Sequence, residues 1–127
     1  MAWKVEIRAE ARADLDRIYD HLVQTHLAFG RSLEESVGLA ERRSGAIREG
    51  LRRFEATPYR GTQHRLGDRE YRHVTIDRAI YWFTLDEANA LVRVIGIFHG
   101  GQNHLDRMFA RLAAQGTADG EPEGGTD

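Results

Sequence analysis

Two histidines, two glycines and a carboxylate stand close together near the end of the chain. His99 and His104 flank Gly100 and Gly101, and Asp106 follows, in the segment FHGGQNHLD. Imidazole and carboxylate groups act as metal ligands and as acid–base catalysts, so this segment is the first candidate for chemistry. The histidine spacing matches neither an i, i+4 helical pair nor a usual zinc pattern, and the chain has no cysteine. We therefore predict no metal site here, and interpret the glycines as the corner where a strand turns into a helix.

The sequence contains no motif for covalent catalysis or phosphate binding. Its serines, Ser32, Ser36 and Ser44, all fall within one predicted helix, where capping or surface roles suffice, and no G-x-S-x-G occurs. The segments GDRE and HGGQ lack the spaced glycines and the lysine with which a P-loop holds phosphates. We therefore expect no cofactor.

Arginine gives a stronger signal in the middle of the chain. Residues 52 to 78 include seven arginines against four acidic residues. One interpretation is a solvated face with ion pairs, and the other is a binding surface, because a guanidinium pairs with carboxylates and phosphates and stacks on aromatic rings. The arginines are Arg52, Arg53, Arg60, Arg65, Arg69, Arg72 and Arg78.

Length and composition predict one domain with a short tail. The 127 residues suffice for a single core, and the chain has neither a long apolar run nor a signal-peptide pattern, so we expect a cytoplasmic protein. Residues 113–127 are poor in apolar groups and include four acids, which predicts a disordered acidic tail after a domain of residues 1–112. Without those four acids the chain has 18 basic against 16 acidic residues, so bulk charge does not favour binding to a large polyanion.

The first half of the chain predicts a strand and a helical hairpin. Apolar residues alternate over residues 3–7, as in a half-buried strand, and then recur at helical spacing over about residues 10–26. Ser32 and Glu35 have the spacing of a capping box, which starts a second helix after the break at Gly30. The helical pattern continues to Phe54 and ends before Pro58. We expect the two helices to pack antiparallel.

The second half predicts a three-stranded antiparallel meander and a short helix. The strands are expected at residues 71–76, 79–85 and 91–98, and the third has apolar residues on both faces, as in a central strand. A helix with a stripe through Leu105, Met108, Phe109 and Leu112 follows the N-cap candidate Asn103. We expect this stripe to pack on the sheet, or alternatively to engage a target with Arg107 and Arg111 beside it. The fold class is therefore α+β, in the order β, α, α, β, β, β, α.

The ordered set of segments resembles a known family. These segments are EARADLDRIYDHL, PYRG, EYRHVTIDRAIYWF and LVRVIGIFHGGQNHLDRM, which together cover about residues 3–112. They resemble the RelE/ParE superfamily of toxins from type II toxin–antitoxin modules, and the HGGQNH corner is most similar to the ParE branch. The resemblance implies a bacterial toxin of the plasmid-stabilisation type that inhibits growth and is neutralised by a ParD-type antitoxin.

The branch of the family decides the expected activity. ParE members poison DNA gyrase without being enzymes, whereas RelE members cut mRNA on the ribosome. For the RNase alternative the resemblance implies Arg72 and Arg78 as strand arginines and His99 as an acid. Their predicted positions, on adjacent strands and at the end of the third, suggest that the three face one concave site. Gly100, Gly101 and Gln102 stand where further basic residues would be expected.

We therefore predict a gyrase poison. The alternatives are a RelE-like endonuclease, or a relative that binds its antitoxin but has lost its activity. The candidate residues for antitoxin or target binding are Arg65, Arg72, Arg78, His99, Arg107 and Phe109.

Overall fold

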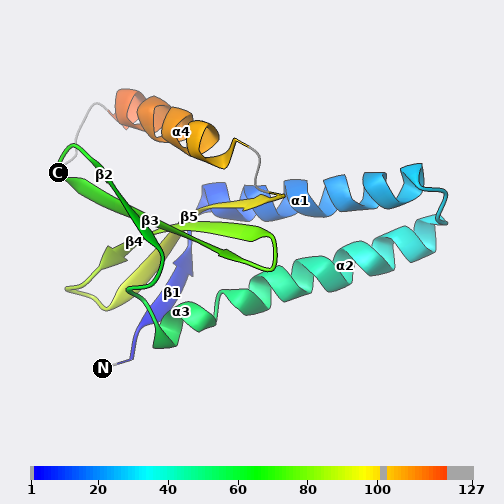
Figure 1. The fold of residues 1–127 in the computed structure, drawn as a ribbon, viewed down its shortest axis with the longest axis horizontal. Helices are drawn as coiled ribbons and strands as arrows, with labels where there is room; N and C mark the ends of the chain where they lie inside the picture. The colour runs from blue at the N-terminus through cyan, green and yellow to red at the C-terminus, as the bar shows by residue number, and fades with distance from the viewer. Residues whose placement is uncertain (1, 101–102, 120–127) are drawn as a thin grey trace.

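The chain folds as an α+β domain in which one mixed sheet separates a helical hairpin from a C-terminal helix (Figure 1). The structure is a computed structural model that describes residues 2–100 and 103–119. The helices are α1 (Ala9–Ala28), α2 (Leu33–Gly50), α3 (Arg53–Ala56) and α4 (His104–Asp119). The strands are β1 (Lys4–Ile7), β2 (Thr62–Leu66), β3 (Arg69–Ile76), β4 (Ala79–Asp86) and β5 (Leu91–His99).

The sheet has five strands in the order β1-β5-β4-β3-β2. Strands β2 to β5 form an antiparallel meander, while β1 pairs parallel with β5 at the opposite edge from β2. The prediction of a three-stranded meander was therefore wrong, because the meander has a fourth strand, β2. Strand β2, TQHRL, was missed because it is an edge strand with mostly exposed, polar side chains, so it lacks an apolar alternation. The three predicted strands are confirmed, as is the prediction that the last of them has apolar contacts on both faces.

The capping box at the start of α2 is confirmed. The Glu35 backbone N–H donates to Ser32 Oγ at 3.1 Å, and the Ser32 backbone N–H donates to Glu35 Oε1 at 3.1 Å. At its other end α2 is shorter than predicted, because it ends at Gly50 and the chain turns before α3. A Cβ on Gly50 would lie 2.5 Å from Tyr81 Oη, which donates a hydrogen bond to the Ile47 carbonyl at 2.7 Å. Gly50, the last residue of α2, thus makes room for a buried tyrosine.

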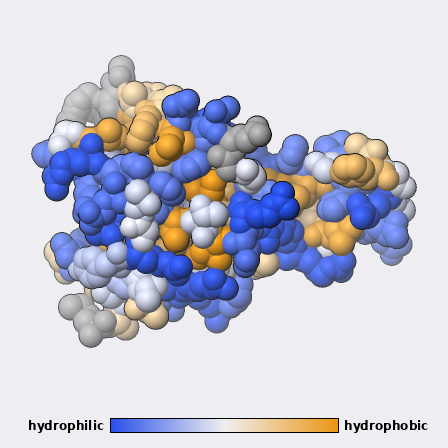
Figure 2. Space-filling view, in the orientation of Figure 1, coloured by the Kyte–Doolittle hydropathy of each residue, from blue (hydrophilic) through white to orange (hydrophobic). Residues whose placement is uncertain are grey.

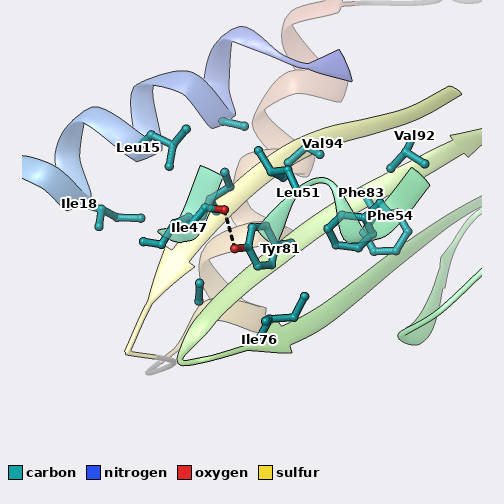
Figure 3. Packing of buried hydrophobic residues seen from close by; sticks show 13 residues of the cluster. Leu15, Ile18, Ile47, Leu51, Phe54, Ile76, Tyr81, Phe83, Val92 and Val94 are labelled. Carbon is teal, nitrogen blue, oxygen red and sulfur yellow. Dashed lines mark hydrogen bonds between the residues drawn. The ribbon is translucent and has the colours of Figure 1, made fainter. Parts of the chain in front are cut away.

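The main core lies between the sheet and the α1/α2 hairpin, and we call this side the hairpin face (Figure 3). Apolar side chains from α1, α2, α3, β3, β4 and β5 pack together there. Phe54 is fully buried, with its ring centroid 5.5 Å from that of Tyr81 and 4.7 Å from that of Phe83. Aromatic pairs at these distances add to the burial of apolar area, so this face is the principal source of stability.

The opposite side of the sheet, which we call the α4 face, is covered by α4. A bulge in β5 opposite Trp82 and Phe83 makes this possible, because it shifts the alternation of β5 between Val94 and Gly96. A Cβ on Gly96 would lie 2.2 Å from Met108 Cε, so the glycine creates the space that Met108 of α4 occupies. Met108 is fully buried there.

Helix α4 is longer than the sequence indicated. It continues to Asp119, past the boundary predicted at Leu112, which corrects the expectation that the tail begins at residue 113. Ala113, Ala114 and Gln115 are strong helix formers, so low apolar content alone was a poor sign of disorder in this stretch. The remainder of the predicted tail, residues 120–127, lies outside the described residues.

Candidate functional site

Arg72, the first predicted strand arginine, is buried on the hairpin face. It lies on β3 in alternation with the core residues Val74 and Ile76. Its Nη1 donates a hydrogen bond to the Tyr59 carbonyl at 2.6 Å, and its guanidinium carbon lies 5.7 Å from the centroid of the Tyr59 ring. Glu70 Oε1 is 4.0 Å from Arg72 Nη2. The side chain is therefore engaged in holding the segment around Tyr59 against the sheet.

Arg78 and His99 lie together at one end of the sheet. Arg78 has a left-handed backbone (φ 72°) in the exposed β3–β4 turn, and its carbonyl accepts a hydrogen bond from Gly100 N–H at 3.1 Å. His99 ends β5 opposite Ala79. Arg43 of α2 donates from Nε to His99 Nε2 at 3.2 Å and from Nη2 to the Asp77 carbonyl. Arg43 is thus a third member of this group, and no local pattern in the sequence indicated it.

The pKa of His99 is lowered from its ordinary value. Burial is the largest cause, because it disfavours the charged imidazolium, and the positive charges of Arg43, Arg78 and His21 lower the pKa further. His99 is therefore mostly neutral at neutral pH. Because its Nε2 accepts the hydrogen bond from Arg43, the neutral ring has its proton on Nδ1.

The predicted concave site that combined Arg72 with Arg78 and His99 is not formed. Arg72 pairs across the sheet with Phe83, whereas His99 pairs with Ala79, four residues away along β4. At the rise of a strand this separates the two positions by roughly 13 Å along the strand direction, and they also lie on strands on opposite sides of β4. The sequence indicated which strands these residues belong to, but the distance between them depends on the strand register.

The other three candidate residues lie in different places. Arg65 is exposed on the edge strand β2. Arg107 is exposed on α4, with its guanidinium carbon 4.7 Å from the centroid of the Phe98 ring. Phe109 packs on the sheet, with its ring centroid 5.9 Å from that of Trp82, and Met108 and Leu112 pack there as predicted. Leu105, the first residue of the predicted stripe, is instead 40% exposed. The six predicted residues therefore do not form one surface.

A histidine cluster on the α4 face was missed by the sequence reading. His64 Nε2 and His73 Nδ1 lie 2.8 Å apart as a hydrogen-bonded pair, and their rings are stacked. His104 Nδ1 accepts a hydrogen bond from Trp82 Nε1–H at 3.1 Å, and the centroids of the His73 and His104 rings are 4.8 Å apart. The signal that could have found this cluster is the pairing of β2 with β3, which places His64 and His73 on the same face.

This cluster, defined by His64, His73 and His104 with Trp82, is electrostatically unusual. The pKa of His73 falls to about 4, mainly because the ring is partly buried, and further because His104 and His64 are close. The pKa of His104 is also lowered, first by burial and then by His64. His73 and His104 are therefore neutral at neutral pH, and neutral imidazoles can accept protons. Within residues 2–100 and 103–119, no group of potential ligands is arranged to hold a metal ion.

A buried ion pair fixes α4 to the rest of the fold. Both oxygens of Asp14 on α1 accept hydrogen bonds from Arg111 of α4, at 2.8 and 2.9 Å. Asp14 Oδ2 also accepts the Ile97 backbone N–H at 2.9 Å, and Arg111 Nη1 donates to the Ile95 carbonyl at 3.2 Å. The hydrogen bonds to Asp14 raise the pKa of Arg111. This bidentate pair joins α1, the bulge of β5 and α4.

Comparisons with solved structures identify the fold. No protein-family model matches the chain, and no curated protein matches it. A chain of the toxin–antitoxin complex RelBE2 from Mycobacterium tuberculosis is similar, with 15% identity and a TM-score of 0.55 over 78% of this chain and 99% of that one. A chain of the chromosomal ParDE system from P. aeruginosa has 17% identity and a TM-score of 0.58 over 78% of this chain and 97% of that one.

A third similar structure is a mutant of the E. coli toxin RelE in the free state, with 8% identity and a TM-score of 0.55 over 91% of this chain and 98% of that one. The chain therefore has the RelE/ParE fold, with its N-terminal strand, helical hairpin, mixed sheet and C-terminal helix. The two RelE/ParE branches share this fold, so it does not distinguish them. In the described part of the chain, every helix is too short or too polar to cross a lipid bilayer.

Proposed function

We propose that this protein is the toxin of a type II toxin–antitoxin system, neutralised by a ParD-type antitoxin in the bacterial cytoplasm. The observation that supports this most directly is the fold, which matches nearly the full length of chains from the RelBE2 and ParDE complexes. At these identities the likeness is one of fold, so the function needs its own test.

Within this class, we propose that the protein poisons DNA gyrase and is not an enzyme. Support comes from the separation of the residues that an RNase of this family would use, since Arg72 is buried against Tyr59 while Arg78 and His99 lie at the other end of the β3/β4 pair. The nearly neutral charge of the chain agrees with this, because docking on ribosomal RNA requires neutralisation of many phosphates.

A gyrase poison needs exposed surface for its target, and the helical hairpin provides it. The hairpin projects beyond the sheet (Figure 1), and Phe29 and Leu33 at its turn are 77% and 63% exposed. Hydrophobic surface is visible at that end of the molecule in Figure 2. The capping box of Ser32 and Glu35 stabilises the start of α2 beside this turn, which favours a preorganised presentation of the apolar side chains.

A second candidate function is a ribosome-dependent mRNA endonuclease. The histidine cluster favours it, because a neutral imidazole can take the proton of a ribose 2′-hydroxyl and, as the imidazolium, the cluster can pass that proton to the leaving oxygen. His73, His64 and His104 would supply these groups on the α4 face. The histidine cluster shares no residue with the set Arg72, Arg78 and His99 that was predicted for an RNase. A substitution in the cluster should therefore abolish mRNA cleavage but leave gyrase poisoning unchanged.

The test is a supercoiling assay with purified gyrase, relaxed plasmid and ATP, with and without the protein. We expect loss of supercoiling together with cleaved plasmid, unchanged by His73→Gln. A protein that leaves supercoiling intact but stops translation in a cell-free extract, and loses this effect with His73→Gln, would contradict the gyrase proposal and support the endonuclease. A folded protein with neither effect would be a relative without toxic activity.

A further inference from the structure

A cleft of about 450 Å³ opens between α1, the C-terminal end of β5 and the start of α4. Ile18, Ile97 and Phe98 contribute apolar lining, and all three are buried. The remaining lining is charged or imidazole and includes His99. Neither Arg72 nor the histidine cluster on the α4 face lines it. The cleft is thus a separate place in which apolar and charged surfaces adjoin.

One arginine in the lining of this cleft, and two arginines that flank the lining residue His99, have no acidic partner in the described part of the chain. Arg107 lines it and lies over the Phe98 ring, and Arg43 donates its Nε–H to His99. Together with Arg78 in the adjacent turn, these arginines form no ion pair with any acid in the described part of the chain. Unpaired guanidinium groups around a partly enclosed space attract an anion, because the interaction is screened less there than on open surface.

The positive charges near the cleft also lower the pKa of His99. After burial, the causes that lower its pKa are Arg43, Arg78 and His21, which stand on α2, the β3–β4 turn and α1. The potential at this end of β5 therefore disfavours a further positive charge. An anion bound in the cleft would offset that potential, and would raise the pKa of His99 toward its ordinary value.

The acids that line the cleft do not cancel this charge. Asp14 is already occupied by the two nitrogens of Arg111, by the Ile97 N–H and by Arg17. Asp20 is the remaining acid of the lining, and it stands on the exposed side of α1. The carboxylate of Asp20 at the cleft would repel each charge of a chain of phosphates, whereas a single carboxylate side chain brings only one negative charge near it.

We propose that this cleft binds a carboxylate side chain that a partner protein presents next to an apolar side chain. Arg107 and His99 receive the carboxylate, and Ile18, Ile97 and Phe98 receive the apolar neighbour. The proposal is independent of whether gyrase or the ribosome is the target, because it concerns the chemistry of the bound group.

The test uses isovalerate, a carboxylate joined to a branched apolar group, and its uncharged amide as the matched probe. The full-length, isotope-labelled protein is titrated near pH 6 at constant ionic strength, and NMR follows the His99 ring and Arg107 Nε signals. We expect saturable binding of isovalerate about tenfold tighter than that of the amide, as for one charge-assisted hydrogen bond. The pKa of His99 should rise when isovalerate is bound.

Variants and competing anions make the result decisive. Arg107→Ala should weaken isovalerate binding about tenfold, while Arg65→Ala, an exposed arginine on the far edge strand, should leave it unchanged. Equal binding of isovalerate and its amide would overturn the proposal. Tighter binding of inorganic phosphate or of a short DNA duplex would overturn the choice of a carboxylate. A rise in isovalerate affinity on neutralising Glu121, Glu123 and Asp127 would identify the chain's own tail as the occupant instead.

Discussion

The two faces of the sheet are built from the same strands but differ in chemistry. Along β4, Tyr81 and Phe83 point into the apolar core of the hairpin face, while Trp82, between them, points to the histidines of the α4 face. The hairpin face is sealed by α1, α2 and α3 with aliphatic and aromatic side chains. The α4 face combines stacked rings, part-buried imidazoles and an ion pair. The hairpin face therefore supplies most of the apolar burial, and the α4 face carries most of the part-buried imidazoles.

The largest effect should come from opening the hairpin face. Phe54→Ala removes a fully buried ring between Tyr81 and Phe83, so we expect a loss of about 3–5 kcal/mol in the free energy of unfolding, measured by urea denaturation. The matched change on the other face, Phe109→Ala, removes a half-buried ring and should cost less than half as much. Equal losses for the two variants would show that the faces contribute alike.

Breaking the ion pair behind α4 should have the next largest effect. Arg111→Ala leaves Asp14, which is 3% exposed, without its bidentate partner, and we expect a loss of about 3 kcal/mol in unfolding free energy. Arg17→Ala is the control, because this arginine also contacts Asp14 but is 62% exposed, and it should cost about 0–1 kcal/mol. A similar loss for both would mean that Arg111 does not hold α4 in place.

Acid should weaken the α4 face before the hairpin face. Unfolded His73 has a pKa near 6.5 and folded His73 one of about 4, so the unfolded chain binds the proton first as the pH falls. Stability is therefore full above pH 6.5 and declines toward pH 4, by about 1.5 kcal/mol once solvent screening of the part-exposed ring is allowed for. His104 adds a loss of the same sign, because its protonation at Nδ1 breaks the bond from Trp82.

The measurement is the unfolding free energy from pH 8 to pH 4, compared between the wild type and His73→Gln. The variant should show a flatter dependence on pH over this window, since it has lost an imidazole whose pKa is lowered to about 4 in the folded state. An unchanged slope would assign the acid sensitivity to other groups.

The smallest effect should come from the end of the hairpin that lies farthest from the sheet. Ser32→Ala removes the acceptor of the Glu35 N–H, and we expect a loss of about 1 kcal/mol or less in unfolding free energy. Ser32→Thr keeps a hydroxyl at the cap and should retain most of the stability. If Ser32→Ala instead cost as much as Phe54→Ala, the turn would belong to the core.

The sequence predicted the features that depend on near neighbours in the chain. The capping box of Ser32 and Glu35 and the inward packing of Met108, Phe109 and Leu112 on α4 follow from local spacing, and both are present. Strand β2 could not be found in this way, because its polar side chains leave no periodic signal. Pairs of distant residues were also beyond local patterns: Arg43 and His99 are 56 positions apart, and Asp14 and Arg111 are 97 apart. The distance between Arg72 and His99 depends on the register in which β4 pairs with β3 and β5, and local sequence patterns do not specify that register.

The most direct test of the proposed function is the order in which syntheses stop in growing cells. Expression of the protein would be induced in bacteria without its antitoxin, and the incorporation of labelled thymidine and leucine followed from the moment of induction. A gyrase poison should reduce thymidine incorporation first, with leucine incorporation falling later. A fall in leucine incorporation before any change in thymidine would contradict the account, and would direct attention to His64, His73 and His104.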